Sequence, residues 1–256
     1  MTRVMAVSDL HADFEENAGW ATLLSLWDHR SDVLIVAGDV SDRLPVVQRT
    51  LEALARRFDA VLFVPGNHEL WVVREESGSG DSLQKFERVL HAAGQSGVLT
   101  GSLRRPGLRV VPLQSWYDHS FGEPGAELRR VWADFVACRW PDGWQAPEVA
   151  REMFARNPPE PPRAEGETLI SFSHFMPRID LMPAGVPARV RMLFPVLGTS
   201  RLDTEIRRLK ASVHVYGHSH LNRDVQVAGL RYVNNAYGYP HETAIAAKRL
   251  LTVWEC

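Results

Sequence analysis

The sequence predicts an α/β protein whose central sheet contains parallel strands. In the first third of the chain, short apolar runs alternate with stretches of helical apolar periodicity. Runs that are apolar throughout are typical of parallel strands buried on both faces. A polar cluster follows each of the first three runs. Because ligands in open α/β sheets lie beyond the carboxyl ends of the strands, these clusters predict a functional site at that end of the sheet.

The first third of the chain is expected to form three strands and two helices. The strands are predicted at residues 3–8, 33–37 and 60–64, where the apolar runs are short enough for single strands. Helices are predicted at residues 20–27 and 46–58 from their apolar periodicity. Pro45 lies just before the second helix, near the first turn where proline is tolerated.

The middle of the chain is less regular. A loop is expected at residues 78–80, a helix at 83–90 and a strand at 109–113. Apolar residues between Leu128 and Val136 have the spacing of one amphipathic helix. The proline-rich residues 157–162 predict a loop or an extended linker.

The last third returns to strands. Apolar runs bounded by turn residues predict five of them, at residues 169–173, 213–216, 225–227, 230–234 and 250–254.

The composition is that of a globular protein with a sizeable core: 45% of the residues are hydrophobic and 23% are charged. A net charge of -2 makes nucleic acid an unlikely partner, because nucleic-acid binders are usually basic. No apolar run approaches the length of a membrane span or of a signal-peptide core. Cys138 and Cys256 are far apart, so no disulfide framework is indicated. We therefore expect a cytoplasmic protein that does not bind membranes.

Five polar clusters stand at the ends of predicted strands. They are Asp9-Leu10-His11, Gly38-Asp39, Gly66-Asn67-His68-Glu69, Ser173-His174 and Gly217-His218-Ser219-His220. Each cluster taken singly has an ordinary explanation as a turn or as a hydrogen-bonded histidine. Together they supply carboxylates, imidazoles and an amide oxygen at successive strand ends, which unrelated turns would not be expected to produce. We interpret the set as a site for metal ions.

The order of these motifs resembles the calcineurin-like metallophosphoesterase superfamily. Its pattern is D-x-H, G-D, G-N-H with a following acidic residue, H, and G-H-x-H, and every element is present between Asp9 and His220. The resemblance implies a four-layer α/β/β/α sandwich of two mixed β-sheets flanked by helices, with the metal site at the C-terminal ends of strands. It also implies a single domain over residues 1–256, with a less family-like helical and proline-rich insertion at about 118–166.

The resemblance also implies a role for each site residue. Seven residues would be metal ligands: Asp9, His11 and His220 for the first ion, Asn67, His174 and His218 for the second, and Asp39 as the bridge. His68 would face the substrate and stabilise or protonate the leaving group, oriented by Asp42. Phosphatase members extend the second motif to G-D-x-x-D-R-G, but Leu44 replaces the final glycine here, so Arg43 is not expected to bind phosphate.

The chemistry of phosphate esters explains this set of ligands. Two cations roughly 3.5–4 Å apart can clamp the phosphoryl oxygens and lower the pKa of a shared water. Two divalent ions carry about +4, and the carboxylates of Asp9 and Asp39 neutralise about two of these charges. The surplus suits a bridging hydroxide and an anionic ester. Mixed nitrogen and oxygen ligands favour two transition-metal ions such as Mn, Fe, Zn, Ni or Co, among which the sequence does not choose.

We therefore expect a metal-dependent phosphoric ester hydrolase acting on a small organic phosphate or a nucleotide. Whether it is a phosphomonoesterase or a phosphodiesterase stays open, as does the oligomeric state. The alternative is a catalytically inactive binding scaffold of the same fold, which would be expected to lose metal ligands or His68. A purely structural metal site would favour cysteine-rich ligands, which this chain lacks.

Two segments are candidates for shaping the substrate site. Residues 118–166 contain Trp132, Trp140 and Trp144, which either form a cap over the metal site or belong to an amphipathic helix packed on the core. The second interpretation is favoured. Residues 234–240 follow the last motif and either reach the pocket or form a plain turn.

Overall fold

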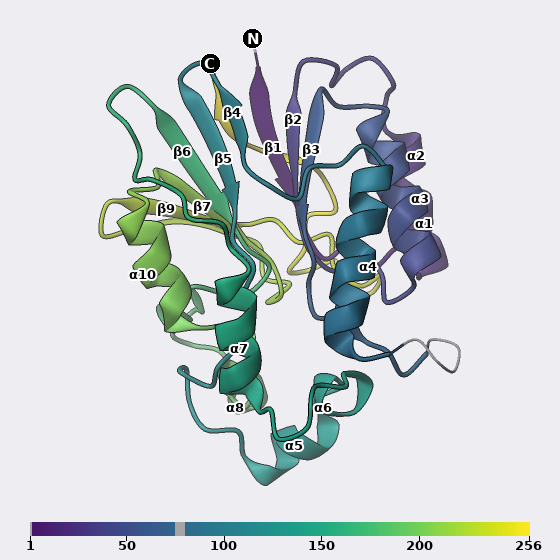
Figure 1. Ribbon diagram of the computed structural model, residues 1–256, viewed down its shortest axis with the longest axis vertical. Helices are drawn as coiled ribbons and strands as arrows, with labels where there is room; N and C mark the ends of the chain where they lie inside the picture. The colour runs from purple at the N-terminus through teal and green to yellow at the C-terminus, as the bar shows by residue number, and fades with distance from the viewer. Residues whose placement is uncertain (1, 75–79) are drawn as a thin grey trace.

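Two β-sheets stacked between layers of helices form the protein, as a computed structural model describes it for residues 2–74 and 80–256. Figure 1 shows the sheets side by side, with the chain termini at one end of the strands and several short helices at the other. The predicted α/β/β/α sandwich is confirmed. The loop expected at residues 78–80 falls largely outside the described residues.

The first sheet has the strand order β10-β1-β2-β3. The strands β1 (Arg3–Val7), β2 (Val33–Ala37) and β3 (Ala60–Val64) are parallel, and β10 (Leu251–Glu255) pairs antiparallel with β1. Every residue of β2 is buried, in agreement with its uninterrupted apolar sequence. Because β1, β2 and β3 are parallel, their carboxyl ends lie at the same edge of the sheet.

The second sheet has the order β4-β5-β6-β7-β9-β8. Its inner strands are parallel to one another: β5 (Leu108–Pro112), β6 (Thr168–Phe172), β7 (Val213–Tyr216) and β9 (Leu230–Asn234). The two edge strands are antiparallel to their neighbours: β4 (Leu103–Arg105) and β8 (Arg223–Val227). Both sheets are thus mixed, as expected.

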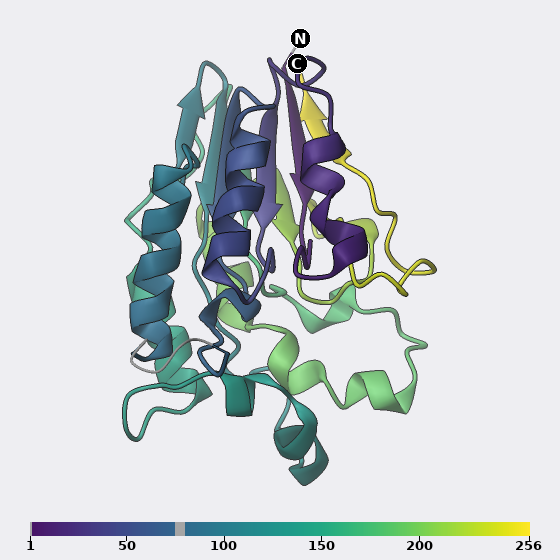
Figure 2. The same cartoon turned by 90° about the vertical axis from the view of Figure 1, so that its right-hand side faces the viewer.

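Helices cover the outer faces of both sheets. The first sheet is covered by α1 (Glu15–Ala18), α2 (Trp20–Leu23), α3 (Leu44–Ala55) and α4 (Ser82–Gln95), which lie in front of the strands in Figure 2. The second sheet carries α7 (Ala146–Ala155) and α10 (Ser200–Arg208). Short helices complete the chain: η1 (His68–Leu70), α5 (Ala126–Val131), α6 (Asp134–Ala137), η2 (Ile179–Leu181), α8 (Ala188–Arg191) and α9 (Phe194–Leu197).

Three hydrophobic clusters fill the spaces between the four layers. One lies between the sheets and joins side chains such as Ile35 of β2 to Phe172 of β6. A second packs the first sheet against its helices, with Leu51 of α3 among its members. The third packs the second sheet against its helices and includes Leu202 of α10. Rigid strands between three packed cores hold the loops at their carboxyl ends.

All four predicted helices differ from the structure in their bounds, two of them only at the ends: α3 spans Leu44–Ala55 and α4 spans Ser82–Gln95. The helix expected at residues 20–27 ends at Leu23, because Leu24 is extended and Ser25 Oγ accepts bonds from the backbone nitrogens of Trp27 and Asp28. The single helix expected between Leu128 and Val136 is instead two helices, α5 and α6. Trp132 breaks it by adopting an extended backbone (ψ 120°). The indole of Trp132 donates a hydrogen bond to Asp134 at 2.8 Å, which holds this break in place.

Several elements were not predicted. The short edge strand β4 has only three residues, and α7 and α10 bury few side chains each. Only Leu202 and Ile206 are buried in α10, so its apolar pattern is too sparse to show a helical period. In the described part of the chain, no helix is long and apolar enough to span a membrane, and Cys138 and Cys256 are both free.

Candidate metal centre

The seven predicted ligands gather at the carboxyl ends of the strands of both sheets. Asp9 and His11 follow β1, Asp39 follows β2, Asn67 follows β3, His174 follows β6, and His218 and His220 follow β7. All seven side chains are buried. Strands from two sheets therefore deliver the ligands to one place, as the sequence predicted from the positions of the motifs.

The ligand atoms form two groups that share one member. Atoms of Asp9, His11, Asp39 and His220 lie within 4.8 Å of one another, and so do atoms of Asp39, His174 and His218. Asn67 joins the second group, since its Oδ1 lies 3.1 Å from His174 Nε2. Asp39 belongs to both groups, and the roles of these residues as ligands stay a prediction. This grouping makes a pair of adjacent cation sites geometrically feasible.

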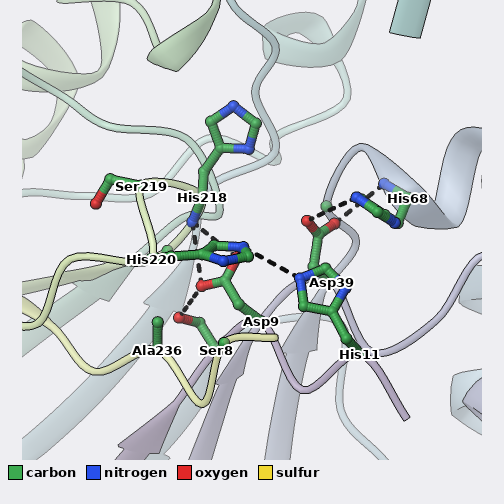
Figure 3. A network of polar contacts seen from close by, with 12 residues as sticks. Ser8, Asp9, His11, Asp39, His68, His218, Ser219, His220 and Ala236 are labelled. Carbon is green, nitrogen blue, oxygen red and sulfur yellow. Dashed lines mark hydrogen bonds and ion pairs between the residues drawn. The ribbon is translucent and has the colours of Figure 1, made fainter. Parts of the chain in front are cut away.

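The histidine ring nitrogens show that cations fit here. His174 Nδ1 donates to the carbonyl of Ala37 at 2.9 Å, and His218 Nε2 donates to that of Val196 at 3.0 Å. In the neutral rings, the remaining nitrogens then carry bare lone pairs, and these lie only 3.0 Å apart. His11 and His220 present their Nε2 atoms to each other at 3.1 Å in the other group (Figure 3). A cation beside His174 and His218 would turn the repulsion between their lone pairs into coordination.

The electrostatics of the carboxylates lead to the same conclusion. Burial raises the pKa of Asp39 well above its usual value, and the nearby charges of Glu69 and Asp9 raise it further. Burial also opposes ionisation of Asp9, but the imidazoles of His220, His174 and His11 outweigh it and lower its pKa. The protein alone thus provides too little positive charge for the carboxylate of Asp39. Divalent cations would supply it.

The backbone is strained where the ligands are attached. Asp9, His11, Asp39, His218 and His220 all have positive φ angles, between 43° and 67°. Non-glycine residues rarely adopt this conformation, and where they do the strain commonly marks a functional site. Hydrogen bonds between the loops hold it in place, such as those from Asp9 N to Gly38 O (2.9 Å) and from His11 N to Asp39 O (3.0 Å).

Two glycines of the motifs are required by close packing against ligands. A Cβ atom on Gly38 would lie 2.5 Å from His174 Nδ1, and one on Gly66 would lie 2.1 Å from Asp39 Oδ1. Gly38 also has a φ of +82°, which glycine adopts without steric cost. The glycines in the G-D and G-N-H motifs therefore make room for the ligands of neighbouring strands.

Glu69, the acidic residue of the third motif, fixes the loop that carries Asp39. Its carboxylate accepts bonds from the backbone nitrogens of Gly66 (2.6 Å), Asp39 (3.0 Å), Val40 (2.6 Å) and Ser41 (3.1 Å). Burial raises the pKa of Glu69 to about 7, although these four bonds act to lower it. Glu69 thus ties the loop after β2 to the loop after β3, a role that the sequence did not reveal.

His68 lies beside the two ligand groups. Its backbone nitrogen donates to Asp39 Oδ1 at 3.0 Å, and its ring packs against Trp71 at an angle of 30° with the centroids 3.7 Å apart. Figure 3 shows the ring next to the carboxylate of Asp39. Burial, and the imidazoles of His174 and His220, lower the pKa of His68 to about 3. The ring is therefore neutral at neutral pH.

Asp42 has a partner that the sequence did not suggest. Its Oδ2 accepts a hydrogen bond from Arg74 at 3.0 Å, and its Oδ1 is buried and has no partner among the described residues. Asp42 as the residue that orients His68 stays a prediction. Arg43 next to it is exposed, consistent with the missing glycine of the phosphatase motif.

An open pocket of about 200 Å³ leads to the ligands. Its lining combines polar residues, among them Asp39, Asn67 and His68, with the apolar residues Trp132, Met182, Val190, Leu193 and Leu197. Of the tryptophans in the insertion, Trp132 lines this pocket, while Trp140 and Trp144 pack against the outer core of the second sheet. The insertion therefore contributes both to the site and to the core.

The segment after the last motif also reaches the pocket. Tyr239 stacks on the ring of His11 (4.2 Å between centroids), and its hydroxyl lies 3.4 Å from His68 Nε2. Glu242 accepts a hydrogen bond from His220 Nδ1 at 2.6 Å. Burial lowers the pKa of His220, but Asp9 and Glu242 prevail and raise it to about 10. Sequence reasoning missed Glu242, because no motif marks a glutamate 22 residues after a histidine.

Glu242→Gln is expected to weaken Mn²⁺ binding by the group of Asp9, His11 and His220. The carboxylate holds the His220 ring so that Nε2 faces the ligands, and losing such a partner typically costs about 10–100-fold in metal affinity. Titration of metal-free protein with Mn²⁺ by calorimetry measures the loss. The exposed Glu255→Gln is the matched control. Equal affinities for the two variants would contradict this role.

Comparison with known proteins is consistent with the geometry. The family model for calcineurin-like phosphoesterases matches residues 2–222. The acyl-carrier-protein phosphodiesterase PptH of Mycobacterium tuberculosis (strain H37Rv) is 28% identical over 261 residues, which cover 93% of this chain and 78% of PptH.

A solved structure shares the fold. The crystal structure of phosphopantetheinyl hydrolase (PptH) from Mycobacterium tuberculosis superposes with a TM-score of 0.83 at 24% identity, covering all of this chain and 96% of that one.

Proposed function

Because this chain belongs to the calcineurin-like phosphoesterase family and is a metal-dependent phosphoester hydrolase, we propose that it cleaves a phosphodiester using two divalent cations. The observation that carries the proposal is the position of Asp39, which is a member of both ligand groups. One carboxylate between two adjacent groups suits a pair of ions better than a single one. Asp9, His11 and His220 would hold one ion, and Asn67, His174 and His218 the other.

The bound cations would supply charge to neutralise phosphoryl oxygens and to lower the pKa of an attacking water. The chain's own contribution is to fix the ligands. Glu69 anchors the loop of Asp39 through backbone bonds, and the backbone nitrogen of His218 donates to both carboxylate oxygens of Asp9 (3.0 and 3.2 Å; Figure 3). These bonds hold the ligands in place before any ion or substrate arrives.

His68 is proposed to protonate the leaving group. It lines the pocket beside Asp39, and Trp71 supports one face of its ring. The ring is neutral in the protein alone, but an anionic ester nearby would favour the protonated form. His68 could then donate a proton to the departing oxygen, which becomes an alcohol. Asp42 is proposed to assist by orienting this region together with its partner Arg74.

The substrate proposed is the diester that links phosphopantetheine to a carrier protein. The similarity to PptH along 93% of this chain supports it. The pocket supports it as well, because its polar residues can take the phosphate while Trp132, Met182 and Leu193 can take an organic arm. Small organic phosphates and nucleotides are the competing substrates.

Manganese and a cytoplasmic location are also proposed. Sites with mixed nitrogen and oxygen ligands accept Mn along with Fe, Zn, Ni and Co. Two free cysteines suit a reducing compartment.

The test is a hydrolysis screen of metal-free protein reloaded with Mn, Fe, Co, Ni or Zn. Substrates are p-nitrophenyl phosphate, its bis-ester, a nucleotide panel and a carrier protein bearing phosphopantetheine, whose conversion is followed by mass spectrometry. Release of phosphopantetheine with a preference for the bis-ester over the monoester supports the proposal. A preference for monoesters or nucleotides would replace the substrate, and two bound ions without any turnover would favour the inactive scaffold.

A further inference from the structure

The insertion places one buried carboxylate against the metal centre. Asp134 of α6 is only 2% exposed. Its Oδ1 accepts hydrogen bonds from Asn67 Nδ2 at 2.8 Å and from Trp71 Nε1 at 2.7 Å, and its Oδ2 accepts one from Trp132 Nε1 at 2.8 Å. None of the family motifs includes this residue. An ionised carboxylate can only accept hydrogen bonds, so it fixes which atom each partner presents to it.

The hydrogen bond to Asp134 fixes the orientation of the Asn67 amide. An asparagine side chain has an oxygen and an NH₂ group of nearly equal size, and only the oxygen can bind a cation. His174 Nε2 lies 3.1 Å from Asn67 Oδ1, and its bare lone pair would attract the NH₂ group if the amide were free to turn. In that orientation, the NH₂ group of Asn67 and not its oxygen would face the position where a cation would bind.

We propose that Asp134 is a positioning residue that holds the Asn67 amide with its oxygen toward the metal centre. This inference rests on the proposed two-cation function. Asp134 acts by accepting the N–H of Asn67, which leaves Oδ1 to face His174. The carboxylate thereby makes the second ligand group complete.

Asp134 also binds two tryptophans that line or support the site. Trp71 packs against His68, and Trp132 forms part of the pocket wall and meets the ring of His218 edge-on, with the centroids 5.7 Å apart. Both indoles donate to Asp134. One side chain of the insertion therefore connects a ligand, the support of His68 and the substrate wall.

The experiment is a titration of the metal-free full-length protein with Mn²⁺, read by calorimetry and by electron paramagnetic resonance. Wild type is expected to bind two ions and to show the signal of a coupled Mn pair. Asp134→Ala is expected to bind one ion normally and the other about 10–100-fold more weakly, with the signal of a single Mn. Asp118→Ala is the matched control, because Asp118 lies in the same insertion but bonds to Thr199 (2.7 Å).

A double-mutant cycle separates positioning from general damage. If Asp134 acts through the amide, Asp134→Ala has no further effect on Mn²⁺ affinity once Asn67→Ala is present. An equal loss in both backgrounds would overturn the proposal, as would normal binding of two ions by Asp134→Ala. Failure of wild type to bind two ions would instead overturn the proposed function.

A second parent protein tests whether misfolding of Asp134→Ala could explain the loss of a Mn²⁺ site. Asp134→Ala leaves two indole N–H groups without an acceptor, which is costly for buried groups. In Trp71→Phe/Tyr117→Phe/Trp132→Phe protein these donors are absent, and so is the Tyr117 hydroxyl that also bonds to Asp134, so the added Asp134→Ala change acts on the Asn67 amide. The same loss of one Mn²⁺ site relative to that parent is expected. No loss would overturn the proposal.

Discussion

Asp39→Asn is expected to lower kcat/KM for a phosphodiester by at least about 10³-fold, because it removes the one carboxylate shared by both ligand groups. The amide keeps nearly the same shape but loses the negative charge and one accepting oxygen. Each tenfold change corresponds to about 1.4 kcal/mol, so the loss is roughly 4 kcal/mol, in the range expected for impaired metal-ion catalysis.

Metal content distinguishes this explanation from simple unfolding. Asp39→Asn should bind fewer than two Mn²⁺ ions per chain, as measured on dialysed protein by elemental analysis, while retaining the circular dichroism of wild type. Asp59→Asn is the control, because Asp59 is exposed and pairs with Arg105 on the surface. Two tightly bound ions together with full activity in Asp39→Asn would refute the bridging role.

His68→Ala is expected to slow hydrolysis by about 10²–10⁴-fold when the leaving group is a simple alcohol. An alkoxide leaves slowly unless it is protonated, and His68 is the imidazole that lines the pocket without belonging to either ligand group. p-Nitrophenolate is stable without a proton, so its esters should lose much less. The measurement is kcat for a series of diesters whose leaving groups span a wide range of pKa.

The dependence of the rate on the leaving group is decisive for His68. A steeper fall in rate with leaving-group pKa in His68→Ala than in wild type supports proton donation. An equal loss for all leaving groups would show that His68 acts in some other way, for instance in binding the phosphate. His91→Ala serves as control, because His91 is exposed on α4 and remote in sequence from the motifs.

Much of the fold followed from local patterns. Residues 33–37, 60–64, 213–216 and 230–234 were predicted as strands with the bounds that the structure has, because short runs rich in apolar residues, bounded by turn residues, leave little choice. The bounds of the helices were predicted less accurately. The predicted helix at residues 20–27 extended too far, and that between Leu128 and Val136 was broken by the tertiary contact of Trp132 with Asp134.

The sequence by itself determined which residues gather at the centre. Each motif is a strand followed at once by a turn with Asp, Asn or His, so the types of ligand and their place at the strand ends are local properties. The parallel strands of the two sheets then bring these ends together.

Only the tertiary structure decided what surrounds the ligands. Asp134 lies 67 residues from Asn67, and Glu242 lies 22 residues from His220, in segments with no motif. Their contacts depend on how short helices and loops pack against the sheet ends, and that packing is set by many weak contacts rather than by any local pattern. A single buried carboxylate can orient a ligand only when the surrounding core holds it at hydrogen-bonding distance, and the chain reaches that arrangement only on folding.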